Sequence, residues 1–169
     1  MSDLYTVISA TNRLTSNTFK VAVQYEQLLK ERNVNVQIFS LEGWKWLERD
    51  AEFARVESEI LVPTTKFVFI VPEYNGSIPG VLKVMFDISR YRDSWYNKKA
   101  LLTGIAKGRA GNLRGVEHLT SILHYLHVFV HPNTLPISSV DKLINEDGVI
   151  EDKGTLQAIN LQLDEFTRF

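Results

Sequence analysis

The sequence contains no cysteine among its 169 residues. This absence excludes disulfide bonds, thiolate nucleophiles and cysteine-ligated metal sites, and it fits a reducing compartment. The sequence also lacks an excess of charge of either sign, because it has 19 Lys and Arg and 20 Asp and Glu, which give a formal net charge of −1. Nucleic-acid binding usually needs a basic surface, so we expect no nucleic-acid partner.

Long apolar runs are missing as well. No run approaches the roughly 20 residues of a membrane span. The chain passes from Met1 almost directly into the short apolar segment Tyr5–Ser9, without the basic start and longer apolar stretch of a signal peptide. We therefore expect a cytoplasmic protein with no membrane contact. Its length suits one domain over residues 1–169.

The chain does contain a regular alternation of short β-type runs and longer helical patterns. The run Lys66–Val71 reads KFVFIV and is apolar almost throughout, which is typical of a strand buried on both faces of a parallel sheet. Five strands alternating with helices predict a doubly wound parallel α/β sheet with right-handed crossovers. The expected strands are Tyr5–Ser9, Val34–Ser40, Lys66–Val71, Lys99–Ile105 and Val128–Val130, and the expected helices are 17–32, 79–89, one around 116–126 and one around 156–166. The segment Leu41–Val62 is less regular and predicts a short helix plus a loop.

Ligands of such sheets bind beyond the carboxyl ends of the strands, so the loops that follow the strands are the candidate sites. The first loop, Ser9–Thr18, is dense in hydroxyl and amide side chains and carries Arg13. A helix N-terminus with such side chains favours an anion, although a simple N-cap needs only one or two of them. The loop lacks both G-x-x-x-x-G-K-[ST] and G-x-G-x-x-G, which favours a phosphomonoester over a triphosphate or pyrophosphate.

The second loop, Pro72–Gly80, contains an Asn-Gly turn and two prolines. A stiff loop of this kind can present N–H groups to the polar edge of a flat ring, and Tyr74 can stack on that ring. The alternative is an ordinary turn before a helix. The third loop, Thr103–Asn112, carries three glycines that let the backbone approach a ligand closely, which is a weak signal by itself.

Taken together, the loops resemble those of the NAD(P)H-dependent FMN reductase family, which includes quinone, azo-dye and chromate reductases. Residues Ala10–Thr18 follow the family pattern G-S-x-R-x-x-S-x-N, with alanine for glycine, threonine for serine and threonine for asparagine. Residues Pro72–Gly80 follow P-E-Y-N-G-S-x-P-G closely. The third loop matches only in being rich in glycine.

The resemblance implies a flavodoxin-like fold that binds FMN and accepts hydride from NADPH or NADH, with a small-molecule electron acceptor. It implies that the family's usual homodimer or homotetramer forms. No side chain is expected to be catalytic, since the flavin carries the chemistry. The phosphate would contact Thr11, Arg13, Ser16, Asn17 and Thr18, and the isoalloxazine ring would lie against Pro72, Glu73, Tyr74, Asn75, Gly76 and Ser77, with Thr103, Gly104 and Gly108 nearby.

Two other functions share this fold. A flavodoxin-type electron carrier would bind FMN without oxidising a nicotinamide itself, but such carriers tend to be strongly acidic and this chain is not. A flavin-free regulatory domain is the second alternative. Lys107, Arg109 and Arg114 are candidates for a 2′-phosphate contact. No metal site is expected, since His124, His127 and His131 need not share a face, and Tyr91, Trp95 and Tyr96 favour core or interface packing.

Overall fold

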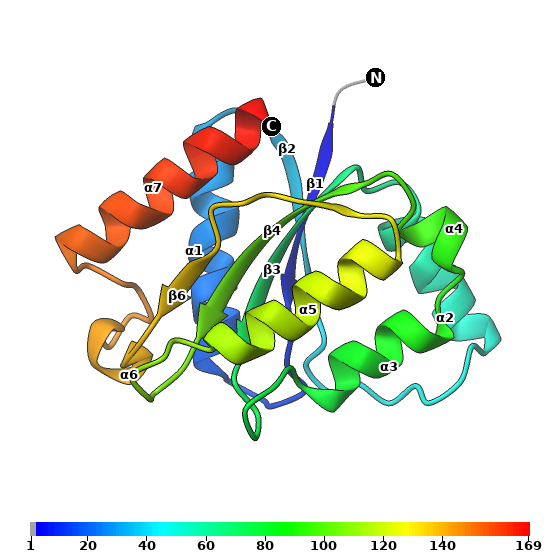
Figure 1. Cartoon of the computed structure of the whole chain (residues 1–169), viewed down its shortest axis with the longest axis horizontal. Helices are drawn as coiled ribbons and strands as arrows, with labels where there is room; N and C mark the ends of the chain where they lie inside the picture. The colour runs from blue at the N-terminus through cyan, green and yellow to red at the C-terminus, as the bar shows by residue number, and fades with distance from the viewer. Residues whose placement is uncertain (1–2) are drawn as a thin grey trace.

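A parallel β-sheet covered by helices on both faces organises the protein (Figure 1). The structure is a computed structural model that describes residues 3–169. Neighbouring strands follow the order β2-β1-β3-β4-β5, and β6 also pairs with β4. This is the strand order of flavodoxin-like folds, which confirms the predicted fold class. The strands are β1 (Leu4–Ser9), β2 (Asn35–Ser40), β3 (Lys66–Pro72), β4 (Lys99–Ile105), β5 (Phe129–Val130) and β6 (Leu135–Ile137).

The fifth strand position differs from the expectation because it is divided between β5 and β6. Phe129 pairs with Lys99 near the start of β4, and Leu135 pairs with Thr103 near its end. Pro132 lies in the interruption and Pro136 lies within β6. Proline cannot donate to a strand ladder, so it is tolerated at an edge such as this one but weakens the sequence signal of a strand.

Two layers of helices cover the sheet. Helices α1 and α7 bury Tyr25 and Phe166 against one face. Helices α3 and α5 bury Phe86 and Leu119 against the other (Figure 1). The helices are α1 (Asn17–Glu31), α2 (Ala51–Val56), η1 (Glu57–Leu61), α3 (Gly80–Ile88), α4 (Tyr91–Ser94), α5 (Leu113–Tyr125), α6 (Val140–Leu143) and α7 (Lys153–Arg168). None of the helices in this described range is long and apolar enough to cross a membrane.

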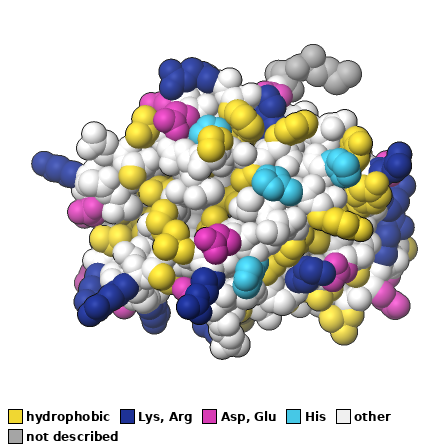
Figure 2. Space-filling model, viewed as in Figure 1, with side chains coloured by type: hydrophobic (Ala, Val, Ile, Leu, Met, Phe, Trp, Pro, Cys, Tyr) yellow, Lys and Arg dark blue, Asp and Glu magenta, His cyan; other side chains and the backbone are white. Residues whose placement is uncertain are grey.

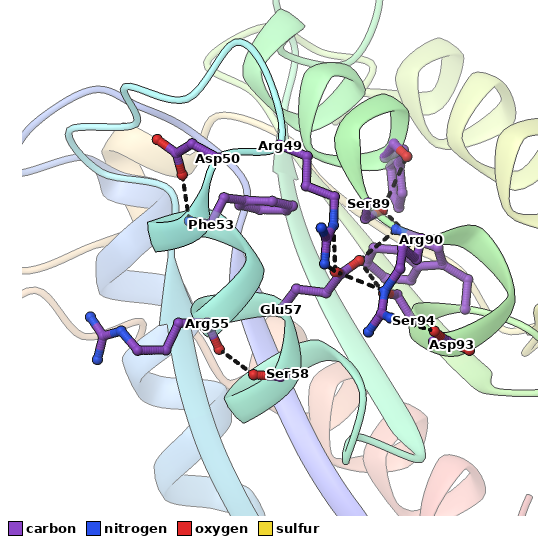
Figure 3. A network of polar contacts seen from close by, with 12 residues as sticks. Arg49, Asp50, Phe53, Arg55, Glu57, Ser58, Ser89, Arg90, Asp93 and Ser94 are labelled. Carbon is purple, nitrogen blue, oxygen red and sulfur yellow. Dashed lines mark hydrogen bonds and ion pairs between the residues drawn. The ribbon is translucent and has the colours of Figure 1, made fainter.

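The irregular segment before β3 contains the predicted short helix and loop. Asp50 caps α2 by accepting a hydrogen bond from the N–H of Phe53 at 2.7 Å, and α2 runs directly into η1, a single turn of π-helix. Glu57, at the start of η1, is fully buried. Its carboxylate accepts hydrogen bonds from Arg49, from the backbone and side chain of Arg90, and from Ser94 (Figure 3). This carboxylate therefore connects η1 to α4.

The aromatic stretch after α3 divides between core and surface. Trp95 is fully buried, and its ring centre lies 4.9 Å from those of Phe67 and Phe86. Tyr91 and Tyr96 are partly exposed. Core packing therefore accounts for Trp95, which leaves no part of its side chain for an interface.

Strands β1, β3 and β4 end at Ser9, Pro72 and Ile105. Because all three are parallel neighbours, their carboxyl ends meet at one edge of the sheet, at the bottom of the view in Figure 1. The three loops singled out in the sequence leave the sheet at this edge.

Candidate cofactor-binding site

A cavity of about 610 Å³ opens at the carboxyl edge of the sheet. Its volume lies within the roughly 300–1,000 Å³ typical of ligand and cofactor sites. All three predicted loops contribute to its wall, and α6 adds one residue. The lining residues are Arg13, Leu14, Ser16, Asn17, Thr18, Pro72, Glu73, Tyr74, Asn75, Gly76, Ile105, Ala106, Lys107, Gly108 and Val140.

The first loop presents the N-terminus of α1 to the cavity. Four of the five residues expected at the phosphate line it, namely Arg13, Ser16, Asn17 and Thr18. Ser16 is the N-cap, and its Oγ accepts from the N–H of Phe19 at 3.1 Å. The earlier N–H groups of the first turn have no partner within the helix and so remain available to an anion.

Thr11, the fifth expected phosphate residue, lies in the buried base of the loop. Its Oγ1 accepts from the N–H of Arg13 at 3.2 Å and lies 2.5 Å from the hydroxyl of Tyr74. The Thr11 side chain is therefore already engaged with two other residues of the site.

The second loop forms a tight turn whose residues Pro72–Gly76 line the cavity. Asn75 and Gly76 have φ values of 52° and 76°, and positive φ at both central positions defines a type I′ turn. Tyr74 and Ser77 close the turn with two backbone hydrogen bonds of 2.9 and 3.1 Å. The Ser77 side chain lies outside the lining, where its Oγ is 2.8 Å from Nδ1 of His118.

Of the three residues expected from the third loop, Gly108 lines the cavity. Thr103 and Gly104 do not line it and are buried in the protein interior. The Thr103 hydroxyl is buried within hydrogen-bond distance of Tyr25 and Gln162. A Cβ on Gly104 would lie 2.4 Å from the carbonyl oxygen of Gly111, so glycine is needed there for the turn to pack against β4. Thr103 and Gly104 belong to β4, and the next residue, Ile105, ends the strand and lines the cavity.

Four lining residues are not among the site residues that the sequence predicts, namely Leu14, Ile105, Ala106 and Val140. A fifth, Lys107, is predicted only as a candidate contact for a 2′-phosphate. Leu14 is an exposed apolar side chain inside a polar loop, which is a usable signal. Val140 follows β6, so its place at the cavity depends on a strand that the sequence did not predict.

The charge around the cavity favours an anion. Arg13 and Lys107 line it together with the N-terminus of α1, and among residues 3–169 Glu73 is the one carboxylate in the lining. Several Lys and Arg side chains gather along this lower edge of the molecule (Figure 2). A guanidinium, hydroxyls, an amide and free helix N–H groups form a donor set that suits a phosphomonoester. The tight turn Tyr74–Ser77 beside them suits the edge of a ring, so the residues present fit FMN.

Known proteins resemble the chain in sequence and in fold. The model of the family described as NADPH-dependent FMN reductase matches residues 5–142. An NAD(P)H-dependent FMN reductase of Pseudomonas aeruginosa is 28% identical over 176 residues, covering 96% of this chain and 94% of the relative. A quinone reductase of Escherichia coli is 34% identical over 106 residues, covering 60% of this chain and 56% of the relative.

The fold is also that of a flavoenzyme NAD(P)H:(acceptor) oxidoreductase, FerB, from Paracoccus denitrificans. The two structures align with a TM-score of 0.74 over 98% of this chain and 95% of that one, at 19% sequence identity. At this identity the likeness concerns the fold alone.

Proposed function

Because the chain belongs to the NADPH-dependent FMN reductase family, we propose that its 610 Å³ cavity is the FMN site of an NAD(P)H-dependent oxidoreductase. The proposed acceptors are quinone-like, azo or other electrophilic small molecules. Bound FMN supplies the redox chemistry, in which a nicotinamide cofactor gives hydride and the acceptor takes electrons. The observation that carries the proposal is the convergence of the anion-binding N-terminus of α1 and the type I′ turn on one cavity.

The chain's own residues bind and orient the cofactor in this proposal. Arg13, Ser16, Asn17 and Thr18 hold the phosphate, and the turn Pro72–Gly76 supports the ring. Thr11, at the buried base of the phosphate loop Ser9–Thr18, supports that loop through its contact with Tyr74. The loops that form the wall are held in place by Thr103, Gly104 and Ser77. The role of these residues is to place two flat rings at reacting distance, which supplies much of the rate of a direct hydride transfer.

The family supports an enzyme rather than a flavodoxin-type electron carrier. Within the proposal, the basic residues near the cavity contact the 2′-phosphate of NADPH. Lys107 lines the cavity, and Arg114 lies beside the turn, 3.9 Å from where a Cβ on Gly76 would be. We also propose a cytoplasmic homodimer or homotetramer, on the strength of the family resemblance.

The test is a reconstitution followed by a turnover assay. The purified protein is incubated with FMN or FAD, freed of excess cofactor, and mixed with NADPH or NADH under anaerobic conditions. We expect one FMN per chain and bleaching of the flavin absorbance by the nicotinamide, followed by reoxidation with a quinone. Failure to retain FMN would contradict the proposed site. Retention of FMN that no nicotinamide reduces would favour the electron carrier. Light scattering at micromolar protein concentration tests the oligomer.

A further inference from the structure

The cavity contains a contact that joins two loops 63 residues apart in the sequence. The hydroxyl of Tyr74, on the ring-facing turn, lies 2.5 Å from Oγ1 of Thr11, on the phosphate loop. The same Oγ1 accepts from the N–H of Arg13. Thr11 is buried and Tyr74 is half-buried, so water has only partial access to this junction.

The ring of Tyr74 carries a second contact. The guanidinium carbon of Arg13 lies 4.2 Å from the ring centre, well inside the roughly 6 Å range of a cation–π contact. One face of the tyrosine ring is therefore covered by a residue of the phosphate loop. A flavin ring stacked on that face would first have to displace Arg13.

A cation–π contact restrains a guanidinium without pairing it with a carboxylate. The five N–H groups of arginine point in several directions in the guanidinium plane, so a contact with one aromatic ring leaves most of them free. An ion pair with a carboxylate would instead occupy two donors and cancel the charge. Tyr74 therefore holds Arg13 in place while its charge and donors stay available to a phosphate.

We propose that Tyr74 is a positioning residue for the phosphate of FMN, acting through Arg13 and Thr11, and is not a stacking platform for the flavin ring. Its backbone belongs to the ring-facing turn, but its side chain serves the phosphate loop. The two loops then form one unit, so that phosphate recognition depends on a residue outside the phosphate motif. This inference rests on the proposed function, because it assigns a role within the FMN site.

Riboflavin separates the two roles, because it has the flavin ring of FMN and lacks the phosphate. Binding of each flavin is measured by quenching of flavin fluorescence, and the ratio of the two affinities reports phosphate recognition alone. We expect Tyr74→Leu to weaken FMN by about tenfold and to leave riboflavin within about threefold, since the variant loses the cation–π contact with Arg13 and the hydroxyl contact with Thr11 but no contact assigned to the flavin ring. Tyr74→Phe keeps the ring and should lower the affinity ratio by about threefold. Tyr96→Leu removes a partly exposed tyrosine elsewhere in the chain and is the matched control.

A double-mutant cycle with Arg13 provides a readout that general damage to the fold would not give. In an Arg13→Ala background, Tyr74→Leu should lower the FMN-to-riboflavin ratio by no more than the roughly threefold expected of Tyr74→Phe, because the guanidinium that the ring positions is gone and only the hydroxyl contact with Thr11 remains to be lost. Equal weakening of both flavins by Tyr74→Leu, or additive effects in the cycle, would overturn the inference and leave the FMN site intact. A wild-type protein that binds neither flavin would instead contradict the proposed function, and the inference with it.

Discussion

Asn112 donates a hydrogen bond from Nδ2 to the carbonyl oxygen of Val71 over 2.9 Å. Asn112 is the fully buried N-cap of α5, and Val71 is the penultimate residue of β3. The bond therefore ties the start of α5 to the point at which the ring-facing turn leaves the sheet. Because Val71 and Asn112 are both buried, no water would replace the Asn112 side chain as a hydrogen-bond donor to the Val71 carbonyl oxygen.

This relationship predicts distinct costs for two substitutions at Asn112, whose φ is 67°. Asn112→Gly removes the side-chain bond but tolerates positive φ, and should lower the free energy of unfolding by about 1–3 kcal/mol. Asn112→Ala loses the same bond and adds about 1–2 kcal/mol of left-handed strain. Urea unfolding of both variants measures the difference. Equal stabilities would show that the backbone at this position relaxes.

The phosphate loop gives a prediction about affinity. Arg13→Ala should weaken FMN binding by roughly 1.5–3 kcal/mol, which is the usual contribution of a hydrogen bond to a charged group. The matched control is Arg55→Ala, which removes an exposed arginine of α2 whose guanidinium lies 3.8 Å from a carboxylate oxygen of Glu59. Fluorescence titration with FMN should show the loss in the first variant and no change in the second. Unchanged affinity in Arg13→Ala would remove this residue from the phosphate site.

The sequence predicts most of this fold because the strong signals are local. The run KFVFIV needs burial on both faces, and the Asn-Gly turn after it needs positive φ at two positions, which Asn75 and Gly76 supply. The three loops that follow β1, β3 and β4 meet at one edge as a direct consequence of parallel pairing. Local patterns were therefore sufficient to find the cavity.

The remaining features depend on partners that are distant in sequence. The burial of the Thr103 hydroxyl depends on Tyr25 and Gln162, and the need for Gly104 depends on Gly111 and Val116. No pattern within the third loop distinguishes a glycine that approaches a ligand from one that lets a helix pack. The sequence did not predict strand β6 for a related reason. Pro136 is compatible with a strand only at the edge of a sheet, and the edge position depends on pairing with the distant strand β4.

The carboxylate in the cavity gives a prediction about catalysis. Glu73→Gln preserves shape and removes only the charge of a side chain that lines the cavity. If hydride passes without an essential side-chain acid or base, the rate of flavin reduction should stay within about tenfold, or about 1.4 kcal/mol of barrier. Stopped-flow absorbance at saturating NADPH measures this rate. A thousandfold loss with FMN still bound would identify Glu73 as a catalytic acid or base.

The last prediction concerns acid stability and the buried carboxylate of Glu57 (Figure 3). Burial alone would raise the pKa of Glu57. Hydrogen bonds from the Arg90 N–H, from Arg49 and from Ser94, together with the charge of Arg49, outweigh burial and hold the pKa of Glu57 below its usual value. The native protein then binds fewer protons at Glu57 than the unfolded chain does. Its contribution to stability is therefore complete above the usual carboxyl pKa of about 4.3 and is lost as the pH falls through the native pKa.

Glu57→Gln tests this contribution without changing the size of the side chain. The variant leaves Arg49 and Arg90 without their shared charge, and should lower the free energy of unfolding at pH 7 by about 3 kcal/mol. Between pH 6 and pH 3 its stability should fall less steeply than that of the wild type. Glu59→Gln, which removes an exposed carboxylate from the same turn, should change little at any pH. Parallel pH profiles for wild type and Glu57→Gln would show that other carboxylates account for the acid sensitivity, because the slope at each pH reports the difference in bound protons directly.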